Sequence, residues 1–141
     1  MQITQILANL VAEALESAQA TGSLPAAGEV EIKIERPKLA EHGDFSTSLP
    51  LALVRTMRVP PIQIADAIVD AMPQHEMIGS AASASPGFVN FTLSMRWLQS
   101  QVNIVRSLGE KFGAVDSGLG KSVQVEFVSV NPTGPLHVGH A

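Results

Sequence analysis

The sequence predicts an α+β fold, in which helices cover a small antiparallel sheet, followed by a linker and the start of a second unit. Stretches with apolar residues three and four positions apart indicate amphipathic helices, and stretches with alternating apolar residues indicate half-buried strands. Their order is helix, strand, helix, helix, strand, strand, helix, which favours this fold class. A glycine-rich stretch over residues 113–122 then separates two unlike patterns.

The first three elements follow from local patterns. A helix is expected over residues 3–18, and Gly22 is a natural stop for it. A strand is expected over "EVEIKIERP", residues 29–37, because three apolar residues alternate there with charged ones. The Ser/Thr cluster before Leu49 indicates the start of a helix that runs from about Ser48 to Met57, with Pro50 in its first turn.

The next elements complete the first unit. A helix is expected to open near Pro61, two strands over about 77–84 and over "PGFVNFTLS" after a turn at Pro86 and Gly87, and a last helix from Met95. The expected inner positions of the two helices are Ile62, Ala65, Ile68, Val69 and Met72 in the first, and Trp97, Leu98, Val102, Val105 and Leu108 in the second.

Composition sets limits on function. A chain of 141 residues with 45% hydrophobic residues is long enough to bury a core. Without cysteine, no disulfide framework and no thiolate metal site is available. No apolar run approaches the roughly 20 residues that span a bilayer, and no signal peptide is evident, so we expect a cytoplasmic protein without membrane contact. The net charge of -4 means that any contact with RNA must be local.

The last part of the chain has a pattern of its own. "VQVEFV", residues 123–128, is expected to form a strand, followed by a Pro/Gly-rich turn and a helix start at residues 137–141. Strand, glycine turn and helix start are the opening of a parallel nucleotide-binding fold, whose remaining strands are missing from this chain. We therefore interpret the chain as a fragment with a first domain (1–112), a linker (113–122) and a truncated second domain (123–141).

Two histidines in "PLHVGHA" are candidates for phosphate binding. His137 and His140 share one face of a helix that begins near Leu136, whose free amides attract anions. Gly139 between them leaves room for a base or ribose against the backbone. Two alternatives stay open: a metal site, which lacks a third ligand, and two ordinary surface residues of a helix.

A second candidate site lies on the last predicted strand. Val89 and Phe91 project to one side of it, while Phe88 and Asn90 project to the other. An aromatic plane beside an amide is how unpaired RNA bases are usually read. The alternative is that a neighbouring helix covers Phe88.

The run "EFVSVNPTGPLHVGHA" resembles the first signature of class I aminoacyl-tRNA synthetases, and specifically that of arginyl-tRNA synthetase. Upstream, "HGDFSTSLPLAL", "PPIQIADAI" and "SPGFVNF" resemble, in order, the appended N-terminal domain of the bacterial enzymes. The resemblance covers nearly the whole chain, and residues 1–29 are its least specific part. Ser48 and Pro50 depart from the family pattern.

The resemblance implies roles for the residues near the end of the chain. His137 and His140 would contact ATP and stabilise the charge on its α-phosphate, and Gly139 would lie beneath the adenine. Glu126 would face the guanidinium of arginine, a planar cation that suits a carboxylate. The amino end of arginine would be positioned by Ser129 and Asn131. Without the resemblance, Glu126 is interpreted as a solvent-facing residue and Asn131 as a turn residue.

The resemblance also implies that the first domain binds the outer corner of the tRNA, with Phe88 and Asn90 reading a D-loop nucleotide. Phosphate contacts are candidate roles for four nearby cations, which otherwise form a solvated face: Arg36, Lys38, Arg55 and Arg58. Gly43 and Asp44 in "HGDF" are interpreted as structural, the first as a backbone requirement and the second as a cap or turn acceptor.

The predicted function is therefore that of the N-terminal part of an arginine–tRNA ligase. The full enzyme would use ATP with Mg²⁺, arginine and tRNA(Arg), whereas the chain alone is expected to be an inactive monomer that needs no cofactor and whose tail can self-associate. Two alternatives are another His-x-Gly-His nucleotidyltransferase and a non-catalytic protein- or RNA-interaction domain.

Overall fold

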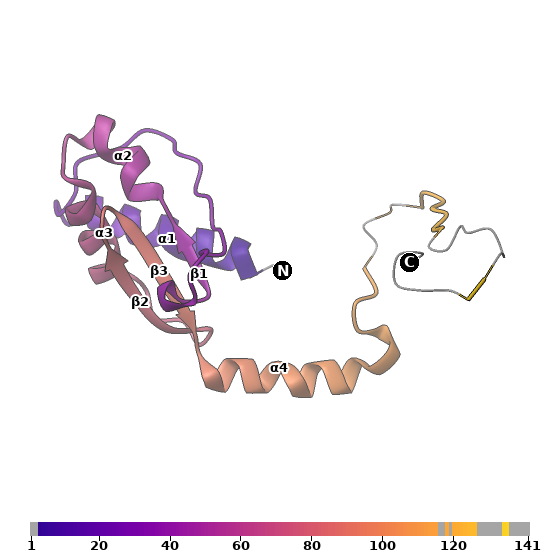
Figure 1. Cartoon of the computed structure of the whole chain (residues 1–141). Coiled ribbons are helices and arrows are strands. Elements are labelled where there is room, and N and C mark those ends of the chain that lie inside the picture. Colours follow the sequence, from indigo (N-terminus) through magenta and orange to yellow (C-terminus); the bar gives the residue numbers. More distant parts are fainter. Residues whose placement is uncertain (1–2, 116–117, 119, 127–133, 136–141) are drawn as a thin grey trace. The chain divides into compact units, whose positions relative to one another are not determined.

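The computed structural model describes residues 3–115, 118, 120–126 and 134–135 (Figure 1). Its two compact units comprise Met1–Arg106 and Ser107–Ala141. The elements in chain order are α1 (Ile3–Ala20), the short 3-10 helix η1 (Ala40–His42), β1 (Phe45–Thr47), α2 (Leu49–Met57), α3 (Pro61–Asp70), β2 (Ile78–Ala84), β3 (Phe88–Leu93), α4 (Met95–Leu108) and the 3-10 helix η2 (Gly109–Lys111). An α+β fold with an antiparallel sheet and covering helices is thus confirmed for the first unit.

The sheet has three strands in the order β1-β3-β2, and both pairings are antiparallel. β3 is therefore central, with Asn90 opposite Ser46 on one side and opposite Ala82 on the other. The two later strands were predicted, but β1 was not. Its three residues are too few to show a period, and their Ser/Thr content resembled a helix start.

The strand predicted over residues 29–37 was wrong. This segment forms no strand, and a single bridge joins Glu35 to Ser46 of β1 through two backbone hydrogen bonds of 2.9 and 2.8 Å. The alternation itself is real, because Val30, Ile32 and Ile34 are half-buried against the core. An alternating pattern indicates which side chains are covered, but it does not indicate whether a neighbouring strand is present to pair with.

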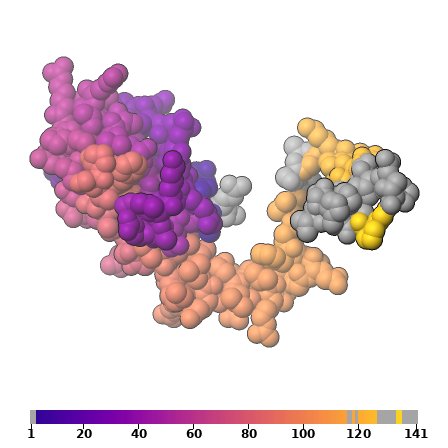
Figure 2. All heavy atoms as spheres, in the orientation of Figure 1, coloured from indigo at the N-terminus to yellow at the C-terminus, as the bar shows by residue number. Residues whose placement is uncertain are grey.

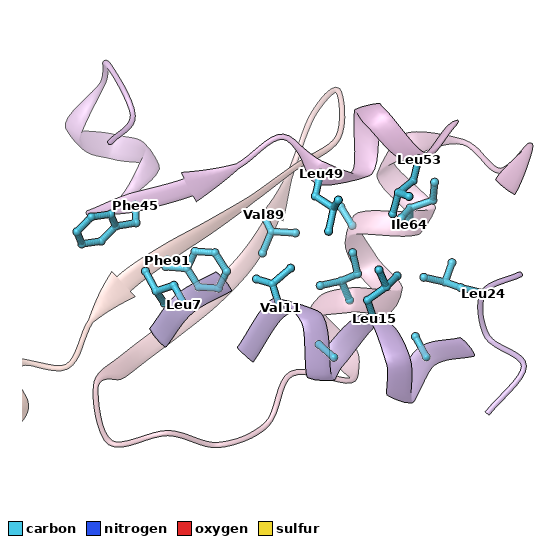
Figure 3. Packing of buried hydrophobic residues seen from close by; sticks show 14 of the residues in the cluster. Leu7, Val11, Leu15, Leu24, Phe45, Leu49, Leu53, Ile64, Val89 and Phe91 are labelled. Atoms are coloured by element: carbon cyan, nitrogen blue, oxygen red, sulfur yellow. The ribbon is translucent and has the colours of Figure 1, made fainter. Parts of the chain in front are cut away.

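The core lies between one face of the sheet and the helices (Figure 3). Leu7 and Val11 of α1 point toward the sheet, where Leu7 lies beside Phe91 and Val11 beside Val89, and Leu15 belongs to the same buried cluster. The predicted helix at the start of the chain is confirmed, and Gly22 follows it with a φ of 79°. This arrangement leaves the other face of β3 without a covering core.

The helices α2 and α3 each contain a proline in their first turn, as predicted. Pro50 lies in the first turn of α2, and Pro61 is the first residue of α3, where the missing N–H costs nothing. The inner face predicted for α3 was partly wrong: the buried residues are Ile64, Ala65 and Ile68, while Ile62, Val69 and Met72 are half-buried. Because α3 packs against α1, α2, β2 and β3, its covered surface is broader than one stripe.

The inner face predicted for α4 was wrong. None of its residues is buried, and Leu98, Val102 and Val105 are 37%, 57% and 38% exposed. Leu108 is exposed as well, and Trp97 alone among the predicted positions is partly buried against the core. The pattern is that of an amphipathic helix, but the described part of the chain offers no element that packs along it.

The strand predicted over residues 123–128 is absent from its described part, residues 123–126. Val123 and Val125 are exposed there, since no described strand lies beside them to pair with. Residues 127 and 128 lie outside the described part, and the predicted domain boundaries stay predictions. No helix among the described residues is long and apolar enough to cross a membrane.

Candidate nucleic-acid interface

The face of β3 that points away from the core carries Phe88 and Asn90. Both side chains are half-buried, whereas Val89 and Phe91 between and after them are completely covered. The alternation predicted for this strand is therefore confirmed. Strand pairing places Ala84 beside Phe88. Because alanine is small, it leaves the Phe88 ring uncrowded.

A hollow of about 330 Å³ lies over this face. Phe88 and Asn90 belong to its lining, so Phe88 is open to the hollow on this side. Ser46 of β1 also lines it, next to its pairing partner Asn90. Five further lining residues come from the segment that precedes β1, and we call them the wall: Glu35, Arg36, Pro37, Lys38 and His42.

Local structure holds the wall in place. The bridge between Glu35 and Ser46 fixes its first residue to β1, and the Arg36 guanidinium lies 5.3 Å from the centroid of the Phe45 ring. His42 ends η1, after which the chain turns back into β1. Figure 2 shows the purple stretch that includes the wall at the surface of the folded unit.

Two hydrogen bonds join the turn before β1 to β3. The Asp44 N–H donates to the Phe91 carbonyl at 2.8 Å, and the Asp44 carboxylate accepts from the Leu93 N–H at 2.8 Å. Gly43 approaches the same carbonyl so closely that a Cβ atom would lie 2.6 Å from it. The interpretation of Gly43 as a backbone requirement is confirmed. The interpretation of Asp44 as a cap or turn acceptor was wrong, because its carboxylate accepts from the distant strand β3.

The wall is locally cationic in a chain of net charge -4. Arg36 and Lys38 are exposed, and neither takes part in an ion pair among the residues that the structure describes. Glu35 contributes one carboxylate to the hollow, and the nearest carboxylate oxygen to His42 Nε2 belongs to Glu41, at 4.0 Å. Lys38 therefore remains available to an anionic ligand, whereas the Arg36 guanidinium lies against the Phe45 ring.

The structure separates the four cations that the sequence suggested as phosphate contacts. Arg36 and Lys38 line the hollow with Phe88 and Asn90, whereas Arg55 and Arg58 are exposed on α2 and at its C-terminal end, outside the hollow. The remaining six lining residues were not anticipated: Glu35, Pro37, His42, Ser46, Ala84 and Ser85. Strand pairing brings Ser46 and Ala84 beside β3, and the bridge to Ser46 brings Glu35 near them. No local pattern in the sequence carries that information.

Most residues of the candidate ATP and arginine site fall outside the described part of the chain. His137, Gly139, His140, Ser129 and Asn131 lie outside the described residues, and Glu126 is exposed. Among the residues that are described, no group of three or more histidines, aspartates or glutamates is arranged to hold a metal ion. The hollow over β3 is thus the site that the structure supports.

Comparison with known proteins gives consistent matches. The family model "Arginyl tRNA synthetase N terminal domain" matches residues 5–93. The arginine–tRNA ligase of Ruminiclostridium cellulolyticum is 40% identical over 141 residues, which cover 99% of this chain and 25% of that protein. The ligase of Nitrosomonas europaea is 44% identical over 117 residues, covering 83% and 20%. The chain thus spans about a quarter of the length of its curated relatives.

Solved structures agree with this result. The arginyl-tRNA synthetase of Thermus thermophilus is similar with a TM-score of 0.57 and 26% identity, over 99% of this chain and 21% of that one. The arginyl-tRNA synthetase of Plasmodium falciparum shares the fold, with a TM-score of 0.57 and 13% identity over 71% of this chain and 17% of that one.

Proposed function

This chain belongs to the arginyl-tRNA synthetase family, whose N-terminal domain it contains, and from that premise we propose that its first unit is the tRNA-binding module of an arginine–tRNA ligase. The observation that carries the proposal is the hollow that Phe88 and Asn90 share with a cationic wall. Such a surface suits an unpaired nucleotide, and the family resemblance makes the D-loop at the tRNA elbow the expected source of that nucleotide.

The two side chains are expected to recognise a base in different ways. The Phe88 ring offers a flat apolar surface, and stacking of a base on an aromatic side chain contributes about 1–3 kcal/mol. This contribution depends little on which base is bound, because every base has a π-face. Asn90 supplies a donor and an acceptor that recognise the edge of the base, so specificity is expected to come from its amide.

For the longer ligase we propose the reaction of the family: arginine and ATP form arginyl-adenylate, and the arginyl group then passes to tRNA. His137, Gly139 and His140 would bind ATP, which carries Mg²⁺, while Glu126, Ser129 and Asn131 would bind arginine. This part of the proposal is supported by the sequence run that contains these residues. The chain alone is expected to be inactive, because it matches only the first quarter of its relatives.

The binding proposal is tested by the variant Phe88→Ala/Asn90→Ala. Its affinity for unmodified tRNA(Arg), and for the same tRNA with an altered D-loop, is measured by fluorescence anisotropy. We expect the variant to bind wild-type tRNA about 10- to 100-fold more weakly, since a stacked base and one or two hydrogen bonds are lost. Altering the D-loop should weaken binding by the wild-type chain and have little further effect on the variant.

The matched control is Phe112→Ala/Asn103→Ala, which removes an aromatic ring and an amide outside the hollow. This control should bind tRNA like the wild type. Equal binding of all three chains to both RNAs would refute the base-reading role and favour a scaffold or protein-interaction role for the domain. The family match makes another His-x-Gly-His nucleotidyltransferase the less supported alternative.

A further inference from the structure

The first turn of α4 is fixed to the core of the first unit. The Ser94 N–H donates to the Met77 carbonyl at 2.8 Å, and the Trp97 N–H donates to the Ser94 Oγ at 3.3 Å. The second bond satisfies one of the free amides at the start of the helix. Met77 is completely buried, and Trp97 packs against the core. The folded unit therefore sets the direction in which α4 leaves the sheet.

Beyond this turn, α4 presents apolar side chains to solvent. Four residues at spacings of three, four and three lie on one side of the helix, and we call them the apolar face: Met95, Leu98, Val102 and Val105. They are between 37% and 67% exposed. The opposite side carries polar residues, among them Gln99 and Asn103. No element within the described part of the chain packs along the apolar face.

A helix of this kind gains little stability without a cover. Isolated helices of about 12–15 residues are marginal in water, and α4 has 14 residues. Its composition does not compensate, because it contains three β-branched residues and no alanine. Most of the stability of helices in proteins comes from packing of an amphipathic face. The apolar face is therefore expected to be covered in the protein in which α4 functions.

The position of α4 in the family indicates what covers it. The family model for the N-terminal domain ends at residue 93, directly before α4. The match to the Ruminiclostridium cellulolyticum ligase continues through α4, but it includes only 25% of that protein. The helix thus lies at the junction between the N-terminal domain and the remaining three quarters of the relatives.

We propose that the apolar face of α4 is the docking surface for the part of the longer ligase that follows this chain. This inference rests on the proposed function, because it takes the chain as the N-terminal part of such a ligase. The surface that docks is apolar and complementary to one side of a helix. Since α4 is fixed to the core at its first turn and covered along its side, it holds the tRNA-binding module in one orientation relative to the catalytic part.

The size of the apolar face favours this partner over a second copy of the chain. A stable interface between separate proteins uses about 20–30 residues on each side, whereas the apolar face is a single stripe of one short helix. Two parts of one polypeptide lose less translational and rotational freedom on contact, because the linkage keeps their effective concentration high. A small face is therefore sufficient for a linked partner and too small for a separate one.

Hydrogen–deuterium exchange followed by mass spectrometry tests the proposal without RNA. Exchange of the backbone amides of residues 98–106 is compared between this chain and the longer ligase. We expect it to be slower by about tenfold or more in the longer ligase, since a covered helix opens less often. Equal exchange rates in the two proteins would overturn the proposal, because nothing in the ligase would then cover α4.

Two charge-matched double variants of the longer ligase identify the side that is covered. Val102→Asp/Val105→Asp places two carboxylates on the apolar face, and Gln99→Asp/Asn103→Asp places two on the opposite side. The first variant should lose the protection of α4, because an unpaired charge is costly to bury. The second should keep it. Protection that persists in the first variant, or is lost equally in both, would overturn the proposal.

A milder variant covers the case in which the two carboxylates prevent the longer ligase from folding. Val102→Ala/Val105→Ala removes apolar area without adding charge, and it should raise the exchange rate of α4 in the longer ligase by about threefold or more. In this chain the same variant should exchange like the wild type. An unchanged rate in the longer ligase would overturn the proposal.

A second copy of the chain is the competing occupant, and protein concentration distinguishes it. Exchange of α4 in this chain is measured over an about hundredfold range of concentration, together with size-exclusion chromatography. We expect one exchange rate and a monomer throughout. Slower exchange with formation of a dimer at the higher concentrations would assign the apolar face to a second copy and overturn the proposed partner.

Failure of this inference is distinguishable from failure of the proposed function. The hollow contains no residue of α4, so both aspartate double variants of this chain should bind tRNA(Arg) equally, within about twofold. Weakened binding by Phe88→Ala/Asn90→Ala together with equal exchange rates overturns the docking surface alone. Wild-type tRNA binding by that variant, with α4 protected in the longer ligase, overturns the base-reading role and supports the docking surface.

Discussion

At the scale of single residues, Gly43 shows how one backbone position supports the site. It has a φ of 84°, in the region that favours glycine, and its Cα lies against the Phe91 carbonyl. The turn that it forms leads from η1 into β1. His42 before it and Ser46 after it line the hollow. The conformation of Gly43 therefore determines how the wall is positioned relative to the sheet.

We therefore predict that Gly43→Ala destabilises the protein by about 1–3 kcal/mol, since a methyl group adds strain at positive φ and a contact of 2.6 Å with the Phe91 carbonyl. Urea unfolding followed by circular dichroism measures this change. The control is Gly28→Ala, where nothing lies within 4 Å of the new methyl group and the strained φ does not occur. Gly28→Ala should be neutral or slightly stabilising. Equal effects of the two substitutions would contradict the prediction.

At the scale of elements, α1 and α4 are both amphipathic, but only α1 is covered. Leu7 of α1 is completely buried against the sheet, while Leu98 of α4 is 37% exposed (Figure 3 shows Leu7 beside Phe91). The free energy gained from an apolar side chain scales with the area that folding removes from water. The two helices thus contribute unequally to stability despite similar sequence patterns.

The matched pair Leu7→Ala and Leu98→Ala tests this difference. Leu7→Ala should lower the free energy of unfolding by about 2–5 kcal/mol, because it leaves a cavity in the core. Leu98→Ala should lower it by less than about 1 kcal/mol, since Leu98 is already 37% exposed to water and no residue of α4 is buried. Differential scanning calorimetry compares the two chains. A loss for Leu98→Ala as large as that for Leu7→Ala would show that α4 is covered in solution.

At the scale of the whole molecule, the buried hydrophobic residues that are described lie between Leu7 and Phe91. All belong to the first compact unit, Met1–Arg106. The hollow belongs to this unit as well, because its lining runs from Glu35 to Asn90. The residues that stabilise the fold and the residues proposed to contact RNA therefore belong to the same compact unit.

We predict that a chain shortened to residues 1–106 keeps the fold and the site. Its free energy of unfolding should stay within about 1 kcal/mol of the full value, since no described core residue is removed. Its affinity for tRNA(Arg) should stay within about threefold. Urea unfolding and anisotropy titrations measure the two quantities. A shortened chain without a cooperative unfolding transition would show that residues 107–141 belong to the folding unit.

Patterns of residues close together in the sequence were sufficient to predict a large part of the fold. The starts of α2 and α3 followed from proline positions, the end of α1 from Gly22, and the alternation in β3 from the period of two residues. These features depend on residues close together in the sequence. The predictions that failed depended on distant partners. The segment over residues 29–37 has one bridge to β1 and no neighbouring strand along the rest of its length, and the apolar face of α4 has no described cover.

The same distinction applies to the site. By itself the sequence determined the α+β class, the family resemblance and the placement of Phe88 and Asn90 on one side of a strand. Only the tertiary structure decided that Arg36, Lys38, His42 and Ser46 join them around one hollow, and that Arg55 and Arg58 do not. A side-chain period records which face of an element is covered, whereas the pairing of β1 with β3 is a contact between residues more than 40 positions apart. Such a contact depends on how all the elements pack together, and no short stretch of sequence encodes it.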